Sequence, residues 1–104
     1  MASSARADPL PYSAHTFIAT VLDELGCSPE AAGLQWLKAA AHAETDEQVG
    51  RAARALAEER LRSGDAEVLD AALCAYVVDG FASSQQAEAL RVAGMRCPTQ
   101  SGAP

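Results

Sequence analysis

The sequence predicts an all-α protein, a compact bundle of about five short helices with disordered N- and C-terminal tails. Alanine occupies 24 of the 104 positions, and alanine has the highest intrinsic helix propensity. Five segments repeat their apolar residues with the period of a helix, and each lies between residues typical of helix starts and ends. No segment alternates apolar and polar residues with period two, and β-branched residues do not cluster, which argues against a sheet.

The length of the chain suits one domain. We expect a single helical domain over residues 12–96, with a flexible N-terminal tail over 1–11 and a flexible C-terminal tail over 97–104, because neither end can bury much apolar surface. Connections of two to four residues favour antiparallel neighbouring helices. Leu, Val, Ile and Phe together fill only 19 positions, so the core is expected to be small.

The first helix is expected over about residues 13–25, before Gly26. Its large apolar residues form one continuous stripe, which consists of Phe17, Ile18, Val21, Leu22 and Leu25.

The second helix is expected after the capping residue Ser28, with Pro29 at its first position and its end near residue 43. Its expected buried side consists of Leu34, Leu37 and Ala41, with Trp36 and Ala40 on a flank.

Thr45 and Gln48 match a capping box, which starts the third helix, and Gly64 ends it after Ser63. Acid–base pairs four residues apart, Glu47 with Arg51 and Glu58 with Arg62, indicate a solvated face. The expected core face consists of Val49, Ala52, Ala53, Leu56 and Leu61.

Asp65 caps the fourth helix, which Gly80 ends. This helix is apolar around most of its circumference and is therefore the expected centre of the bundle. Ser83 and Gln86 form another capping-box pattern, from which a fifth helix extends to about residue 93, before Gly94.

The connection between the last two helices, Asp79-Gly80-Phe81-Ala82-Ser83-Ser84-Gln85-Gln86, resembles the turn between two helices in TerB-like tellurite-resistance domains. The resemblance covers about 20 residues, and Gln86 stands where an acid is usual in that family. A generic capped connection between two helices explains the run equally well.

The charge balance restricts the partners. Eight basic residues stand against 14 acidic ones, for a net charge of −6, so a nucleic-acid partner is not expected. No stretch is apolar enough to span a bilayer or to form a signal core, and we therefore expect a cytoplasmic protein with no membrane partner. The excess of Arg over Lys and the alanine content indicate a GC-rich bacterial source.

Candidate chemistry is sparse, and no cofactor or metal is expected. His15 and His42 suit surface or capping positions near helix ends, and the Glu-x-x-His pairs of di-metal bundles are missing. The three cysteines include no C-x-x-C pair, so reduced thiols are expected. Cys27 is the one thiol candidate, because it lies just before a helix start, and we expect it to be inert.

Two hypotheses about function remain. The favoured one is a small non-enzymatic interaction protein, an adaptor, regulator or inhibitor of a larger protein partner, which self-associates as a homodimer because its own core is small. Trp36 is the expected interface anchor. The alternative is a small helical enzyme or ligand-binding protein. Its pocket candidates are Trp36, Leu37, Tyr76, Phe81 and Met95, with His15, His42 or Asp79 as the polar group.

Overall fold

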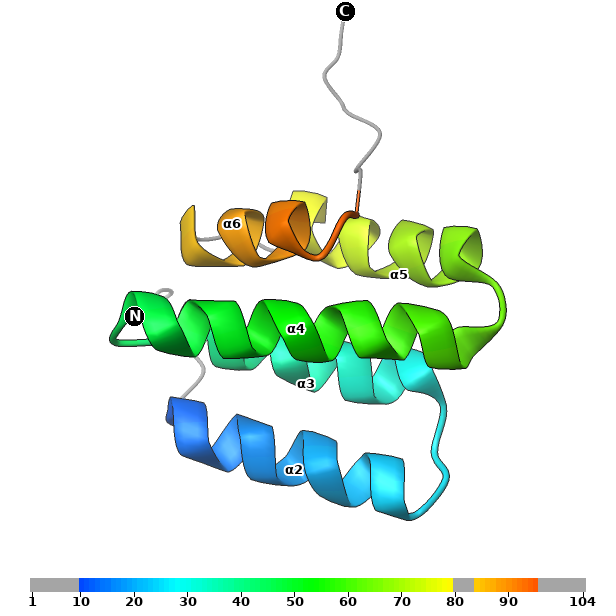
Figure 1. Ribbon diagram of the computed structural model, residues 1–104, viewed down its shortest axis with the longest axis horizontal. Coiled ribbons are helices and arrows are strands. Elements are labelled where there is room, and N and C mark those ends of the chain that lie inside the picture. Colours follow the sequence, from blue (N-terminus) through cyan, green and yellow to red (C-terminus); the bar gives the residue numbers. More distant parts are fainter. Residues whose placement is uncertain (1–9, 80–83, 96–104) are drawn as a thin grey trace, which may run out of the picture.

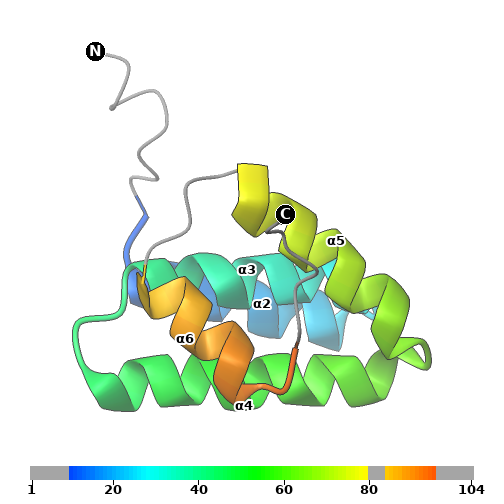
Figure 2. The same cartoon turned by 90° about the horizontal axis from the view of Figure 1, so that it is seen from above.

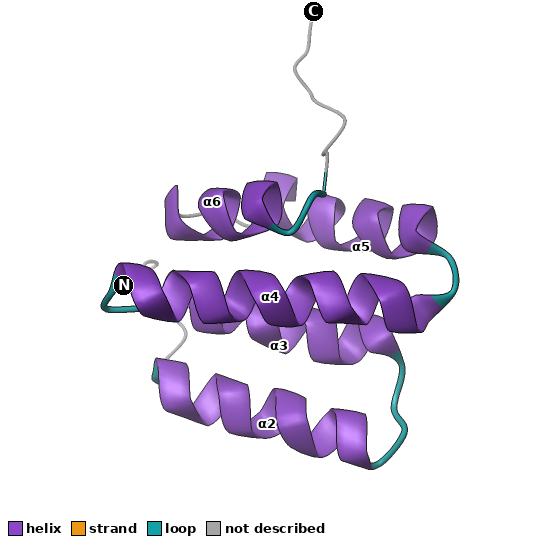
Figure 3. Ribbon diagram, in the orientation of Figure 1, coloured by secondary structure: helices purple, strands orange, loops and turns teal. Residues whose placement is uncertain are grey.

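The computed structural model describes residues 10–79 and 84–95, except for the side chains of residues 77–79. The expected tails over 1–11 and 97–104 lie outside the described residues apart from residues 10 and 11. The described elements are five helices with no strand among them, which confirms the all-α prediction (Figure 3). They are α2 (Tyr12–Glu24), α3 (Pro29–Ala41), α4 (Asp46–Ser63), α5 (Ala66–Asp79) and α6 (Ser84–Val92).

Local capping chemistry sets the helix ends, as predicted. The hydroxyl of Ser28 accepts a hydrogen bond from the amide of Ala31 at the start of α3, and the hydroxyl of Thr45 accepts one from the amide of Gln48 at the start of α4. The Gln48 side chain accepts from the amide of Glu44, one residue before the expected position. Gly64 ends α4 with a φ of 75°, a conformation that favours glycine.

The centre of the bundle is α3, and the expectation that the fourth helix (α5) is central is wrong. α3 packs against α2, α4, α5 and α6, whereas α2 packs mainly against α3 and lies at one edge of the bundle (Figure 1). From above, α6 runs obliquely across α4 (Figure 2). α3 can be central because small residues cover much of its buried surface.

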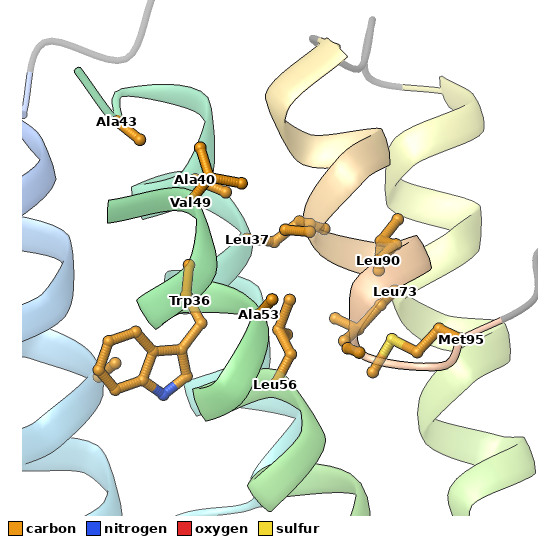
Figure 4. Close-up of a cluster of buried hydrophobic side chains, with 14 of the residues drawn as sticks. Trp36, Leu37, Ala40, Ala43, Val49, Ala53, Leu56, Leu73, Leu90 and Met95 are labelled. Carbon is orange, nitrogen blue, oxygen red and sulfur yellow. The ribbon is translucent and has the colours of Figure 1, made fainter. Parts of the chain in front are cut away.

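Glycine and alanine let the helices approach α3 closely. A Cβ atom on Gly33 would lie 3.1 Å from Cδ1 of Leu73 on α5, closer than ordinary contact, so the Leu73 side chain would have to shift to accept it. Half of the buried hydrophobic residues in the described part of the chain are alanines. Around them pack the fully buried side chains of Leu37, Leu56 and Leu73 (Figure 4).

Several expected buried faces are wrong. The apolar stripe of α2 does not face the core. His15 and Ala19 are the buried residues of that helix, while Phe17 and Leu25 are 70% and 73% exposed. On α3, Leu34 and Ala41 are only half-buried. The buried residues of α3 are Ala32, Gly33, Trp36, Leu37, Ala39 and Ala40.

On α4, Leu61 is 85% exposed, whereas the other four expected core residues are buried. Gln86 on α6 is buried and donates to the carbonyl oxygen of Leu37 at 3.1 Å, so its side chain links α6 to α3 in addition to any role at a helix start. Polar contacts of this kind compensate for the small apolar area that an alanine-rich core buries.

The contrast between Leu56 and Leu61 on α4 gives a test of the core. Leu56→Ala is expected to lower the free energy of unfolding by about 2–5 kcal/mol, because it leaves a cavity beneath α3 and α5. Leu61→Ala is the matched control and is expected to change it by less than about 0.5 kcal/mol. Urea unfolding followed by circular dichroism measures both, and equal losses would contradict the assigned core face.

Candidate functional site

The structure places most of the predicted interface or pocket residues in the core. Trp36, Leu37 and Met95 are all buried, and Trp36 is only 9% exposed (Figure 4). Tyr76 is half-buried against the same cluster. Phe81 lies outside the described residues, as does the side chain of Asp79.

Two hollows in the described part of the chain avoid these residues. One, of about 210 Å³, lies between the start of α3 and the junction of α4 with α5, and its lining includes Pro29, Val68 and Leu69. The other, of about 290 Å³, is lined by Asp46, Val49, Ser84, Gln85 and Glu88, at the starts of α4 and α6. Neither hollow has an aromatic residue or a basic group in its lining.

His15 is buried, contrary to the surface position expected for it. Its Nδ1 lies 2.7 Å from Oε1 of Gln35 on α3, and its ring centroid lies 5.7 Å from that of His42, which is half-buried at the end of α3. This contact fastens the first half of α2 to α3 through polar groups. Among the described residues, no group of three or more His, Cys, Asp or Glu side chains could hold a metal ion.

The cysteines differ from one another. Cys27 is an exposed free thiol in the connection between α2 and α3. Cys74 is buried and disulfide-bonded, so the expectation of reduced thiols is wrong for this residue. No described helix has both the length and the apolar character needed to cross a bilayer.

A carboxyl pair lies at the junction of α2, α3 and α4. Glu59 on α4 is 1% exposed, and its carboxyl group lies near the Asp23 carboxyl on α2 and the Trp36 indole on α3, whose Nε1 makes no hydrogen bond with any described residue. Arg62 Nη1 lies 3.0 Å from Oε2 of Glu59 and 2.8 Å from Oδ1 of Asp23. We call these two acids the Asp23–Glu59 pair.

Burial dominates the electrostatics of this pair. Loss of hydration, together with the hydrogen bond and the negative charge of Asp23, raises the pKa of Glu59 from 4.5 to about 7, although Arg62 and Trp36 act in the opposite direction. Glu59 is thus the described acid most affected by its surroundings. Sequence reasoning missed it, because the expected partner of Arg62 was Glu58, which is exposed.

A second feature is an apolar surface on the outer side of α2. On a helix, the residues Ala14, Phe17, Ile18, Val21 and Leu25 recur at spacings of three and four and share one side. We call them the α2 outer flank. Phe17 and Leu25 are exposed and the other three are half-buried, since α2 packs mainly against α3 and turns this side away. The sequence had revealed the stripe but not that it remains outside.

Comparisons of the chain with protein-family models, with curated proteins and with solved structures find no match.

The position of Cys27 gives a test of the thiol hypothesis. Cys27→Ser is expected to leave the free energy of unfolding within about 0.5 kcal/mol of the original value, because the thiol is exposed and a serine fits the same space. It is also expected to leave self-association unchanged. Thermal melts and light scattering measure the two quantities. A marked loss of stability or of self-association would indicate that Cys27 has a functional role.

Proposed function

We propose that this chain is a non-enzymatic protein-interaction domain, an adaptor, regulator or inhibitor of a larger protein partner, which self-associates through the α2 outer flank. The observation that carries the proposal is the exposure of Phe17 and Leu25 on a helix whose buried side holds only Ala19 and His15. Exposed apolar side chains gathered on one helix face are typical of interaction surfaces.

A second copy of the chain is the occupant that the charges favour. The chain carries a net charge of −6, so two copies repel each other over most of their surfaces. The α2 outer flank contains no charged residue, and it can therefore pair with itself without bringing like charges together. Spacings of three and four are also those with which one helix packs its side chains into the grooves of another.

The two copies of α2 pair in an antiparallel arrangement in this proposal. A two-fold axis midway between Ile18 and Val21 sets Ile18 opposite the second copy's Val21, and Leu25 opposite the second copy's Ala14. Each of these contacts joins a larger side chain to a smaller one, which suits close packing. The two-fold symmetry makes each of these contacts occur twice in the dimer.

Helix electrostatics support the same orientation. The first turn of α2 contains no acidic residue, and its N-cap, Pro11, makes no side-chain capping hydrogen bond. The last turn of α2 ends in Asp23 and Glu24. Antiparallel pairing brings the Glu24 carboxylate of one copy toward the positive end of the other copy's helix, whereas parallel pairing brings like ends together.

The size of this surface predicts a weak dimer. The area that one helix face from each copy can bury lies at the low end of the range for specific interfaces, about 1,200–2,000 Å² in total. The association is therefore expected to depend on protein concentration in the micromolar range or above, and to strengthen with added salt as the repulsion between the two acidic copies is screened.

Substitutions on and off the flank test the proposal. At high concentration the original chain is expected to show a light-scattering mass near twice 10.8 kDa. Leu25→Glu and Phe17→Glu place charges in the interface and are expected to give monomers with unchanged helix content. Leu61→Glu is the matched control, because Leu61 is similarly exposed in the last turn of α4, and it is expected to remain a dimer.

The exposed thiol of Cys27 reports the orientation. Antiparallel pairing separates the two Cys27 residues by about 20 Å, at 1.5 Å for each residue of the helix, so mild oxidation is expected to give no dimer cross-linked through Cys27. Parallel pairing would bring the two thiols together. A cross-linked dimer that Cys27→Ser abolishes would overturn the antiparallel arrangement, and a chain that stays monomeric at every concentration would overturn the self-association itself.

A further inference from the structure

The Asp23–Glu59 pair lies where three helices meet, and it has two carboxyl groups but contacts only one positively charged side chain in the described part of the chain. Arg62 is the cation that contacts both carboxyl groups, and it is about half exposed. The contribution of α3 is Trp36, an uncharged indole. The neighbouring cation Arg60 is engaged with Asp70 on α5, at 2.8 Å. Two carboxylates and one guanidinium would leave an excess negative charge in a place where Glu59 has almost no contact with water.

The unpaired polar atoms at this junction indicate where a proton belongs. Oε1 of Glu59, Oδ1 of Asp23 and Nε1 of Trp36 are all buried without a hydrogen bond to the residues that the structure describes, although Oδ1 has the ionic contact with Arg62 Nη1 at 2.8 Å. A buried carboxyl oxygen without a donor is costly. One proton placed between the two carboxyl groups supplies a hydrogen bond that two carboxylates cannot make to each other, and it leaves one negative charge to balance Arg62.

We propose that Asp23 and Glu59 share one proton and act as a pH-sensitive latch, which holds the C-terminal end of α2 against α3 and α4 while the proton is bound. Loss of the proton leaves two carboxylates that share the one guanidinium of Arg62. Their repulsion and the lost hydrogen bond loosen the end of α2, which is already the edge helix of the bundle (Figure 1). The raised pKa of Glu59, about 7, sets the latch to respond near neutral pH.

The sign of the effect follows from linkage. The pKa of Glu59 is higher in the folded chain than its ordinary value of 4.5, so the folded chain binds more protons between those two values. The contribution of this group to stability is therefore complete below about pH 4.5 and is lost as the pH rises through 7. Most acids in folded proteins have lowered pKa values and act in the opposite direction.

The latch has a consequence for association that rests on the proposed function. The same helix carries the α2 outer flank on one side and Asp23 on the other. Loosening α2 removes the rigid surface that a second copy packs against, so rising pH is expected to weaken the dimer. The latch itself lies within one copy and does not depend on a partner.

Tryptophan fluorescence gives a direct readout, because Trp36 is the only tryptophan in the chain and lies beside Glu59. A titration from pH 5 to 9 is expected to show a transition near pH 7. Glu59→Gln keeps the shape of the side chain and removes the proton exchange, so the transition is expected to disappear. Glu58→Gln is the matched control on the exposed side of α4 and is expected to retain it.

Unfolding measurements test the same exchange. Between pH 5.5 and pH 8, ionisation of Glu59 is expected to raise the unfolding equilibrium constant of the original chain by a factor on the order of ten relative to Glu59→Gln. Because the comparison is between two variants, the contributions of the groups that they share cancel. Asp23→Asn is expected to move the fluorescence transition to lower pH, since it removes the neighbouring negative charge.

Two results would overturn the latch: a transition near pH 7 that persists in Glu59→Gln, or one that is missing from the original chain. If Glu59→Gln fails to fold, infrared spectroscopy of the original chain decides, because a protonated carboxyl band must be present at pH 6 and absent at pH 9. Repeating the titration in monomeric Leu25→Glu separates the two proposals. A transition retained there supports the latch without a dimer, and one lost there overturns a latch confined to one copy.

Discussion

The close approach of helices to the small residues of α3 is the constraint on which the rest of the bundle depends. Gly33 lets the Leu73 side chain of α5 approach to a distance at which an added Cβ atom would require that side chain to shift. Alanines on α3 and α4 bring those two helices together, and only a few leucines are then needed to fill the centre. The close packing of the helices also explains why large apolar residues such as Phe17 remain outside the core. A core built at this separation has no space for them.

Sequence reasoning located the helix ends well and the buried faces poorly, for a physical reason. The ends depend on residues three or four positions apart, as in the contact of Thr45 with the amide of Gln48. A buried face depends on what lies opposite, often far along the chain. The apolar stripe of α2 was correctly seen, yet the neighbour α3 offers alanines and Gln35, against which Ala19 and His15 fit better than Phe17.

The same limit explains why Glu59 escaped notice. Glu58 and Glu59 are adjacent and chemically identical, and only Glu58 has the four-residue spacing to Arg62 that stabilises an isolated helix. Glu59, however, falls three residues after Leu56, on the stripe that begins with Val49 and Ala52. That position is a sequence signal for burial. Its partner Asp23 lies on another helix, and no local pattern connects the two.

The attachment of α2 links both proposals. Its two buried residues are an alanine and a histidine, so it gains less from apolar burial than a helix that buries leucines. Directional polar contacts hold α2 to the bundle instead, from His15 to Gln35 near one end of the helix and from Asp23 to Arg62 near the other. The carboxyl contact of Glu59 with Asp23 and Arg62 responds to pH through the raised pKa of Glu59, and apolar contacts do not. A helix held in this way, with its apolar side outward, is suited both to docking a second copy and to being released by the loss of a proton.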